Sequence, residues 1–417
     1  MKNAYRLAIV GGGAAGLFLS SALSANAAHN IALFERGERL GRKLSATGNG
    51  QGNVTNLRAA EAEYFSSTTP GKAESLIQKY PPQKMMGWLE ERGLLLVADE
   101  KGRVYPAGRQ ASAVTDALRF TVEQQNVDVF LGEKITGIEK KNGQFLLTAQ
   151  TAEGEKKYFA ENVVLCTGGK AAKNFGTDGT AYALAQMFGH TVTPLYPSLV
   201  QLKTDVSRVK TLKGIRVSPA VVTATWQENG KPRTHAVEGD ILFTDYGVSG
   251  DAIFRLTAFF TDKIDKSTTL SIDFLPQYTQ KQVENALREK RNRYPHTPWQ
   301  ELLCGMVNNQ IARAIMKRTV ENAFAVAAEQ VKGFTLPVTG TLGFDYAQVT
   351  KGGISLAEVD DSLQSTQVEG LYFAGEVLDV DGQCGGYNLQ WAFSSAMIVA
   401  AAISAKYSKE NTPKQRK

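Results

Sequence analysis

Cysteine and histidine are scarce in this sequence, which has three cysteines and four histidines among 417 residues. The cysteines, Cys166, Cys304 and Cys384, are far apart and form no Cys-x-x-Cys pair. This spacing argues against a disulfide scaffold, a zinc ribbon and a dithiol redox motif. The histidines show no metal-ligand spacing either. We therefore expect no metal site and a reduced, cytoplasmic protein.

Long apolar runs are also missing. Three consecutive glycines, Gly11 to Gly13, interrupt the apolar N-terminal stretch, and the pattern runs on into a second strand, which argues against a secretory signal. No apolar run approaches the ~18–20 residues that span a bilayer. We expect no membrane contact.

The excess of positive charge is confined to one end of the chain. The formal net charge is +6, and residues 406–417, with five Lys/Arg and one Glu, contribute +4 of it. Because this end has almost nothing apolar to bury, we predict a flexible basic tail over residues 406–417. The remaining body is nearly neutral, which does not favour nucleic acid as a partner. We expect a small-molecule substrate, and the choice between monomer and homodimer stays open.

Glycine, by contrast, is abundant, with 39 residues that cluster rather than scatter. The first cluster, Gly11-x-Gly13-x-x-Gly16, follows an apolar run typical of a buried strand and opens a helical pattern. Gly11 permits a tight turn, Gly13 lets a pyrophosphate approach the backbone, and Gly16 lets the helix pack on the strand. The sequence therefore predicts a dinucleotide site.

A second apolar run, residues 31–34, ends at Glu35, which is placed to accept hydrogen bonds from an adenosine ribose. We group Arg36 and the two residues of the first helical turn, Ala14 and Ala15, with these cofactor-binding candidates.

Two later glycine clusters favour FAD over NAD, because each follows an apolar strand and the fingerprint occurs only once. Thr167-Gly168-Gly169 ends a mid-chain strand, and Gly375-Glu376 follows the strand at residues 371–375. In FAD enzymes of this broad type, such turns reach the ribityl chain and phosphates, and the last helix points its N-terminus at the flavin pyrimidine ring. The candidates at the start of that helix are Asp379, Gly385, Gly386, Tyr387 and Asn388.

The rest of the chain reads as an α/β protein with inserts. Residues 135–165 alternate as strands with turns at Asn142-Gly143 and Glu153-Gly154, and residues 219–244 do so with a turn at Asn229-Gly230. Residues 280–330 are helical and charged, and residues 388–405 form an apolar helix.

Several motifs resemble those of a bacterial family of NAD(P)/FAD-dependent oxidoreductases, described as aminoacetone oxidase-like or bile-acid enone reductase-like flavoproteins. The resemblance is carried end to end by GRKL at residues 41–44, TGNG at 47–50, NVTN at 53–56, LFT at 242–244, TKGGI at 350–354 and GLYFAGEVLDVDGQCGGYNLQ at 370–390. It adds the following cofactor-binding candidates: Arg42, Lys43, Thr47, Gly48 and Asn53.

The resemblance implies three structural parts. A Rossmann-like FAD-binding domain of the glutathione-reductase type would comprise residues 1–196 and 336–417, with an inserted β-rich, barrel-like substrate domain over 197–275 and a helical subdomain over 276–335. The sequence departs from the family's motifs at Gln51-Gly52, Asp245, Asp251 and Cys384. The roles of Asp245 and Cys384, and the identity of the substrate, stay open.

The flavin would exchange a hydride with a small organic substrate while the protein supplies position and electrostatics. Tyr246, Lys351 and Tyr387 are the candidate catalytic residues, whereas we expect Trp391 to pack in the core. Three functions remain in competition. The first is an oxidase with oxygen as the acceptor, as the aminoacetone oxidase-like members imply. The second is a reductase of activated C=C bonds with NAD(P)H as transient reductant. The third is a protein that retains FAD as a structural or sensing element and binds RNA or a protein partner through the basic tail and the helical insert. The cations of the insert are Lys290, Arg291, Arg293, Arg313, Lys317 and Arg318.

Overall fold

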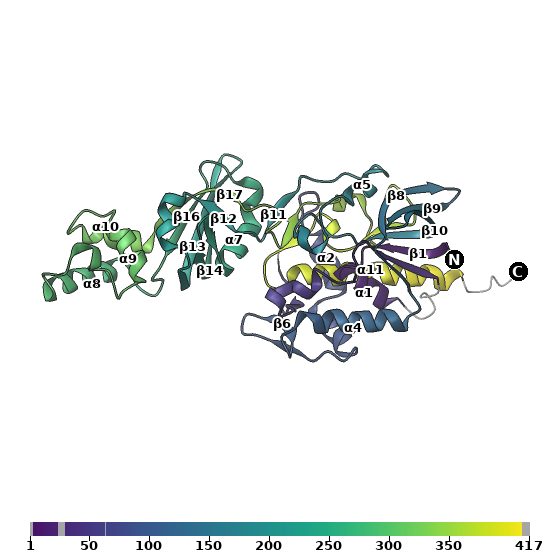
Figure 1. The fold of residues 1–417 in the computed structure, drawn as a ribbon, viewed down its shortest axis with the longest axis horizontal. Helices are drawn as coiled ribbons and strands as arrows, with labels where there is room; N and C mark the ends of the chain where they lie inside the picture. The colour runs from purple at the N-terminus through teal and green to yellow at the C-terminus, as the bar shows by residue number, and fades with distance from the viewer. Residues whose placement is uncertain (1–2, 24–29, 63, 411–417) are drawn as a thin grey trace, which may run out of the picture. The chain divides into compact units, whose positions relative to one another are not determined.

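The computed structural model describes residues 3–23, 30–62 and 64–410, and these divide into two compact units. Residues 1–196 and 349–417 form the first unit and residues 197–348 the second. The predicted fold class is confirmed, since the first unit is a Rossmann-like α/β domain and the second contains a closed barrel and a group of helices (Figure 1). The chain returns to the first unit at Val349 rather than at residue 336, because strand β17 (Phe334–Thr341) completes the barrel.

The sheet of the first unit has the strand order β7-β2-β1-β10-β9-β8, and β19 also pairs with β10. Buried apolar runs form its centre, at residues 7–10, 31–34, 163–165 and 371–373, as is typical of parallel strands covered on both faces. The edge strand β7 is largely exposed. The parallel members are β1 (Ala4–Val10), β2 (Ile31–Glu35), β7 (Asp128–Leu131), β10 (Gly154–Leu165) and β19 (Leu371–Phe373).

An antiparallel extension follows from the predicted turns. Strands β8 (Lys134–Lys141) and β9 (Gln144–Thr151) form a hairpin whose turn residues Asn142 and Gly143 have φ of 51° and 82°. Positive φ at both positions is what a two-residue type I′ turn requires, and Asn-Gly supplies it with little strain. The predicted strands over 135–165 are thus confirmed.

Two helices from opposite ends of the chain pack against each other beneath this sheet. Helix α1 (Ala14–Ala22) contacts the long α11 (Tyr387–Glu410), and the rings of Phe18 and Phe393 meet edge-on with centroids 5.3 Å apart. Trp391 is buried, as expected, and donates from its indole nitrogen to the Gly375 carbonyl at 3.0 Å.

Shorter elements complete the first unit. They are α2 (Lys72–Lys79), α3 (Pro82–Glu90), α4 (Ala111–Gln124), α5 (Tyr182–Gln186), β3 (Thr55–Asn56), β4 (Tyr64–Phe65), β5 (Leu96–Ala98), β6 (Arg103–Pro106), β18 (Val349–Lys351) and β20 (Asp381–Gly382).

The prediction of a flexible tail from residue 406 is wrong for its first five residues. Helix α11 continues to Glu410 because Tyr407 is buried and its hydroxyl donates to the Arg6 carbonyl at 2.6 Å. Lys406 also donates to Asn162 Oδ1 at 3.0 Å. The remaining residues of the predicted tail, 411–417, lie outside the described part of the chain.

By length and composition alone, residues Tyr387–Lys409 of α11 could cross a membrane, although we expected no run of that length. Of the apolar 18-residue window in this segment, 61% is buried within the protein, and the helix contacts α1, which is the environment of a core helix.

The second unit is built on a six-stranded barrel with its own apolar core. Its longest strands, β13 and β14, form a hairpin whose turn residues Asn229 and Gly230 have positive φ, as the Asn-Gly signal predicts. The barrel strands other than β17 are β12 (Leu202–Thr204), β13 (Arg216–Glu228), β14 (Lys231–Phe243), β15 (Gly247–Ser249) and β16 (Thr269–Asp273). The main helices are α7 (Asp251–Phe260), α8 (Gln280–Arg293), α9 (Asn309–Met316) and α10 (Phe324–Lys332).

A buried Ser-His-Glu cluster, which no sequence spacing reveals, fastens the segment after α5 to the residue 356–366 loop. His190 Nε2 lies 2.7 Å from Ser365 Oγ, and His190 Nδ1 lies 3.1 Å from Glu358 Oε2. Ser365 Oγ also accepts from the backbone N–H groups of Gln367 and Val368 at 3.1 and 2.9 Å. Because these bonds occupy both lone pairs of a buried hydroxyl, the cluster is a structural clamp rather than a nucleophile.

The clamp predicts an acid-sensitive contribution to stability. Burial lowers the pKa of His190 despite the neighbouring Glu358, so the folded state binds fewer protons than the unfolded state. The stabilisation is therefore present above the unfolded value of about 6.5 and is lost as the pH falls through the folded-state pKa. We expect His190→Gln to lower the free energy of unfolding by about 1–3 kcal/mol near neutral pH, because it leaves buried partners unsatisfied.

Urea unfolding of the wild type and His190→Gln, compared at a neutral and a mildly acidic pH, checks this. The difference between the two should shrink in acid, while the matched exposed variant His296→Gln should follow the wild type. An unchanged difference would contradict the assignment of His190 as the titrating group.

Candidate functional site

The three fingerprint glycines occupy three different environments at the carboxyl end of β1. Gly11 has a φ of 107°, and a Cβ there would lie 2.5 Å from the Cys166 carbonyl oxygen. A Cβ on Gly16 would overlap the Gly11 carbonyl oxygen, so the first helical turn packs directly on the loop. Gly13, in contrast, faces open space, with no atom within 4 Å of its Cβ position. An open backbone at a helix N-terminus is the place for a pyrophosphate.

Glu35 lies at the end of β2, and its carboxylate is bonded to the glycine turn that follows β1. Its two carboxylate oxygens accept from the backbone N–H groups of Gly12 at 2.9 Å and Gly37 at 2.7 Å. Each oxygen retains a second lone pair, so the carboxylate is oriented for a ribose without being saturated.

Arg36 and Arg42 are anchored to the segment that follows the Thr167-Gly168-Gly169 turn. The Arg36 guanidinium forms an ion pair with Asp178 at 2.9 Å, and Arg42 donates to the Asn174 carbonyl at 3.0 Å. The pKa of the Asp178 carboxyl falls to about 2, since hydrogen bonds from Thr180 and Arg36 outweigh its partial burial. Both guanidinium groups are therefore bonded to other residues of the protein.

A polar network joins the N-terminal and C-terminal candidates. Lys43 donates to Glu376 Oε2 at 2.7 Å, and Glu376 Oε1 accepts from the Thr350 backbone N–H at 3.0 Å. Thr350 Oγ1 in turn accepts from the N–H groups of Lys170 and Ala171 at 2.7 and 2.9 Å. Thr350 is the hub of this network and was a motif residue but not a predicted cofactor contact.

Asp379 is buried and held by Ser67, which donates to Oδ2 from its backbone at 2.9 Å and from its hydroxyl at 2.6 Å. Burial raises the pKa of Asp379, and the Ser67 bonds and Lys351 counteract part of that rise. Ser67 was missed by sequence reasoning, since no motif surrounds it.

The loop before α11 is tightly fixed by Asn388. Its side chain accepts from Gly382 N at 2.9 Å and donates to the carbonyls of Gly382 and Gln383 at 2.9 and 3.3 Å. A Cβ on Gly386, where φ is 104°, would overlap the Thr55 carbonyl, so only glycine fits there. Tyr387 follows, and its carbonyl accepts from the Tyr64 hydroxyl at 3.3 Å. Asn388 thus shapes the loop, and Gly385 is part of the loop.

The Thr47-Gly48 turn and Asn53 have roles within the chain as well. Thr47 Oγ1 donates to the Leu44 carbonyl at 2.7 Å, and Gly48 adopts a left-handed φ of 58°. The buried Asn53 amide donates to the Thr55 and Val104 carbonyls at 3.0 and 3.1 Å. The Thr47 and Asn53 side chains are thus bonded within the protein, whereas Gly48 is exposed.

Two buried hydroxyls indicate that the site fits a polar cofactor. Thr167 Oγ1 and the Tyr182 hydroxyl have no hydrogen-bond partner within residues 3–23, 30–62 and 64–410. Buried hydroxyls are normally paired, and those of Thr167 and Tyr182 belong to the turn after β10 and to α5 near Glu376 and Asp379. With open Gly13 and oriented Glu35, this donor set matches the phosphates and hydroxyls of FAD. Tyr182 carries no sequence motif and was missed.

The remaining candidates are placed as follows. Ala14 and Ala15 begin α1, and a Cβ on Gly375 would lie 2.7 Å from that of Ala15, so the two chain ends approach closely. Gly168 has a left-handed φ of 69°, and a Cβ on Gly169 would lie 2.7 Å from Glu376 Oε1. Tyr246 belongs to the second unit, between β14 and β15, and its contact with a substrate stays a prediction. Beside it, Asp245 is exposed and pairs with Lys213 at 2.7 Å.

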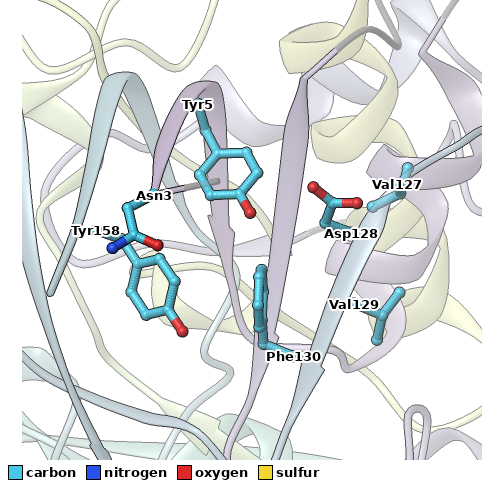
Figure 2. Close-up of a pocket in the computed structure, with 7 residues that line it drawn as sticks. All are labelled: Asn3, Tyr5, Val127, Asp128, Val129, Phe130 and Tyr158. Carbon is cyan, nitrogen blue, oxygen red and sulfur yellow. The ribbon is translucent and has the colours of Figure 1, made fainter. Parts of the chain in front are cut away.

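A separate pocket of about 580 Å³ lies at the other end of the parallel strands. Figure 2 shows Tyr5, Phe130 and Tyr158 gathered there, with the Tyr5 hydroxyl turned toward Asp128. Tyr5 precedes Gly11 by six residues along β1, which is roughly 20 Å of strand. This pocket is therefore remote from the glycine turn and is not the dinucleotide site.

The cations considered for RNA contact are largely engaged within the protein. Arg313 pairs with Glu301 at 2.8 Å, Lys290 donates to the Cys304 carbonyl at 2.6 Å, and Arg291 donates to the Thr297 carbonyl at 2.8 Å. Arg318 donates to the Ser207 carbonyl at 3.2 Å. Arg293 and Lys317 are exposed. Among the described residues, no group of three His, Cys, Asp or Glu could hold a metal ion.

Comparison with known proteins matches residues 5–402 to the family model of the HI0933-like protein Rossmann domain. The 3-dehydro-bile acid delta(4,6)-reductase of Clostridium scindens is 30% identical over 96% of this chain and 99% of that protein. The ribosomal RNA dihydrouridine synthases of Haemophilus influenzae and Escherichia coli are 28% and 30% identical, over 95% of this chain and 98% and 97% of those proteins.

The glycine geometry predicts two opposite outcomes for the same substitution. Gly13→Ala adds a methyl group to open space, so the apoprotein should keep its stability while FAD affinity falls about tenfold or more, since the methyl occupies the pyrophosphate position. Gly16→Ala should instead destabilise the apoprotein by about 1–3 kcal/mol, because its methyl overlaps the Gly11 carbonyl.

Thermal unfolding of the apoproteins and fluorescence titration with FAD separate the two effects. Unchanged FAD affinity in a well-folded Gly13→Ala protein would contradict the placement of the pyrophosphate.

Proposed function

The chain belongs to the HI0933-like Rossmann-domain family and is an FAD-dependent oxidoreductase; from that premise we propose that it reduces a carbon–carbon double bond conjugated to a carbonyl group. The reductant would be a nicotinamide dinucleotide that binds transiently. The electrons and one proton reach the substrate as hydride, and the second proton comes from solvent or a side chain.

The observation that supports this proposal is the chemistry shared by the curated relatives. One is named for reducing delta(4,6) bonds of a 3-dehydro bile acid, and two are named for making dihydrouridine in ribosomal RNA. A 3-oxo-Δ4 ring and a uracil ring differ greatly in size and polarity. Both nevertheless present a C=C bond conjugated to a ring carbonyl, and both names describe adding two hydrogens across such a bond.

The FAD-binding groups are proposed from the fit of the site. Gly13 and the α1 N-terminus would receive the pyrophosphate, Glu35 the adenosine ribose, and the Thr167 and Tyr182 hydroxyls the cofactor's polar atoms. The turn residues Gly168, Gly169 and Gly375, with Glu376, would line the cofactor from the other side. When bound, the flavin supplies a hydride at N5.

The protein must then do two things at the reacting end. It must hold the activating carbonyl, whose oxygen gains negative charge as hydride adds to the β-carbon, and it must exclude bulk water. Lys351 and Tyr387 are the side chains of the first unit that we propose on the substrate side. Tyr246 belongs to the second unit, and its catalytic role stays a prediction. The Tyr64 hydroxyl is already committed to the Tyr387 carbonyl, so it is not a free proton donor.

Two other functions remain to be separated from this one. An oxidase would return electrons to oxygen and release peroxide. A uridine base within RNA is the second candidate substrate, which the two dihydrouridine synthases favour. The intramolecular bonds of Lys290, Arg291, Arg313 and Arg318 leave few cations of that insert for phosphate, which weighs against it.

Anaerobic stopped-flow reduction by NADH and NADPH provides the test. We expect rapid bleaching of the flavin by at least one nucleotide. Addition of a cyclic enone should then restore the oxidised spectrum at least tenfold faster than the corresponding saturated ketone, because only the enone accepts hydride.

A uridine-containing RNA, added to the reduced protein in place of the enone, tests the second substrate class by the same return of the oxidised spectrum. Bleaching by a small amine but by neither nucleotide, followed by peroxide formation in air, would overturn the reductase proposal in favour of an oxidase.

A further inference from the structure

Lys351 occupies a restricted position at the end of β18. Its side chain is only 14% exposed, and its ammonium lies 3.9 Å from Oδ1 of the buried Asp381. The same ammonium stands 4.2 Å from the centroid of the Phe65 ring. Asp381 and Phe65 are themselves paired across the short β4–β20 ribbon, so one small element presents both.

The ammonium of Lys351 keeps unused hydrogen-bonding capacity. At 3.9 Å its distance to Asp381 is beyond hydrogen-bond range, and none of its three donors reaches an acceptor in the part of the chain that the structure describes. Lys43 and Lys72 differ, since Lys43 donates to Glu376 at 2.7 Å and Lys72 to the Leu356 and Val359 carbonyls at 3.0 and 2.6 Å. The donors of this partly buried cation are therefore available to an external acceptor.

The backbone on both sides of Lys351 is fixed. Thr350 is held through its hydroxyl by Lys170 N and Ala171 N and through its own N–H by Glu376. On the other side, Gly352 has a φ of 88°, and a Cβ there would overlap the Pro194 carbonyl. The ammonium is therefore positioned by rigid chain rather than by a mobile loop, as electrostatic stabilisation requires.

Lys351 lies next to the loop that precedes α11, the helix whose N-terminus we expect to face the flavin ring. Asp381 directly precedes Gly382, whose N–H and carbonyl are bound by Asn388 in the first turn of α11. Lys43 and Glu376 form an ion pair, and Thr350 N–H also binds Glu376. We expect this ion pair to lie toward the phosphates of the cofactor.

We propose, resting on the proposed function, that the Lys351 ammonium binds the activating carbonyl oxygen of a planar cyclic enone and carries its charge as the oxygen becomes enolate-like. Phe65 offers the apolar face beside that oxygen, and Asp381 is too distant to take up the hydrogen-bond donors of the lysine. The site accordingly selects substrates by a carbonyl conjugated within a flat ring.

Phenols test this without turnover, because a phenolate is a stable, flat analogue of a cyclic enolate. The probes are 4-cyanophenol and its methyl ether, titrated into oxidised, FAD-saturated protein while the flavin absorbance is followed. Wild type should bind the phenol more tightly than the ether. Lys351→Met should weaken phenol binding roughly 10- to 100-fold and leave the ether unchanged, since a charge-assisted hydrogen bond is lost.

Two matched variants sharpen the result. Asp381→Asn removes a competing negative charge and should tighten phenol binding; a purely structural Lys351–Asp381 pair would give lower stability with no gain in affinity. Lys43→Met, at the phosphate end, should lower FAD retention but leave phenol affinity unchanged once FAD is saturating. Lys351→Arg should restore part of the phenol preference.

Equal phenol affinities in wild type and FAD-replete Lys351→Met would overturn the proposal. If Lys351→Met does not retain FAD, the affinities of the wild type for the phenol and for its ether provide the test. Equal affinities for the two compounds would then overturn the proposal. A Lys351-dependent phenol preference without enone reduction would leave the oxygen-binding role standing while the proposed reaction failed, so the two failures are distinguishable.

Discussion

The architecture depends on strand β10 lying between β1 and β19 in parallel. Cys166 N donates to the Val10 carbonyl at 2.8 Å, and Ala374 N donates to the Leu165 carbonyl at 3.1 Å. These bonds bring strands separated by hundreds of residues to one edge of a sheet. Because the glycine turns after all three strands emerge at their carboxyl ends, one end of the sheet collects residues from the beginning, middle and end of the chain.

Close backbone approach is the condition for bringing these turns together, and it explains why two of their positions require glycine. A side chain at Gly375 would collide with Ala15 of α1, and one at Gly386 would collide with the Thr55 carbonyl. At both positions φ is also positive, so the turn and the packing demand the same residue. Around these contacts, hydrogen bonds among Lys43, Glu376 and Thr350 hold the loops together.

Polarity is distributed unevenly along this site. Glu35, Glu376 and Asp379 all accept hydrogen bonds from the protein, and their orientations follow from those bonds. The Lys351 ammonium, in contrast, forms no hydrogen bond within the described residues, and the Phe65 ring lies beside it. Saturated groups fix geometry, whereas unsaturated ones are available to a ligand. This contrast connects the fold to the chemistry that we propose.

The sequence by itself determined the features whose physics is local. Apolar runs of strand length, Asn-Gly turns that need positive φ, and the spacing of Gly11, Gly13 and Gly16 each depend on a few neighbouring residues, so the Rossmann-like unit, the hairpins and the dinucleotide turn could be predicted. Only the tertiary structure decided which distant residues become partners. It places Ser67 against Asp379, Tyr182 near Glu376 and Asp379, and His190 between Ser365 and Glu358. It also decided that Tyr407 extends the last helix into the predicted tail, and that β17 belongs to the barrel. These features arise from hydrogen bonds and burial between distant segments, which leave no periodic signal in either segment. In the same way, only the surroundings of Lys351 in the folded chain determine whether its ammonium has hydrogen-bond partners.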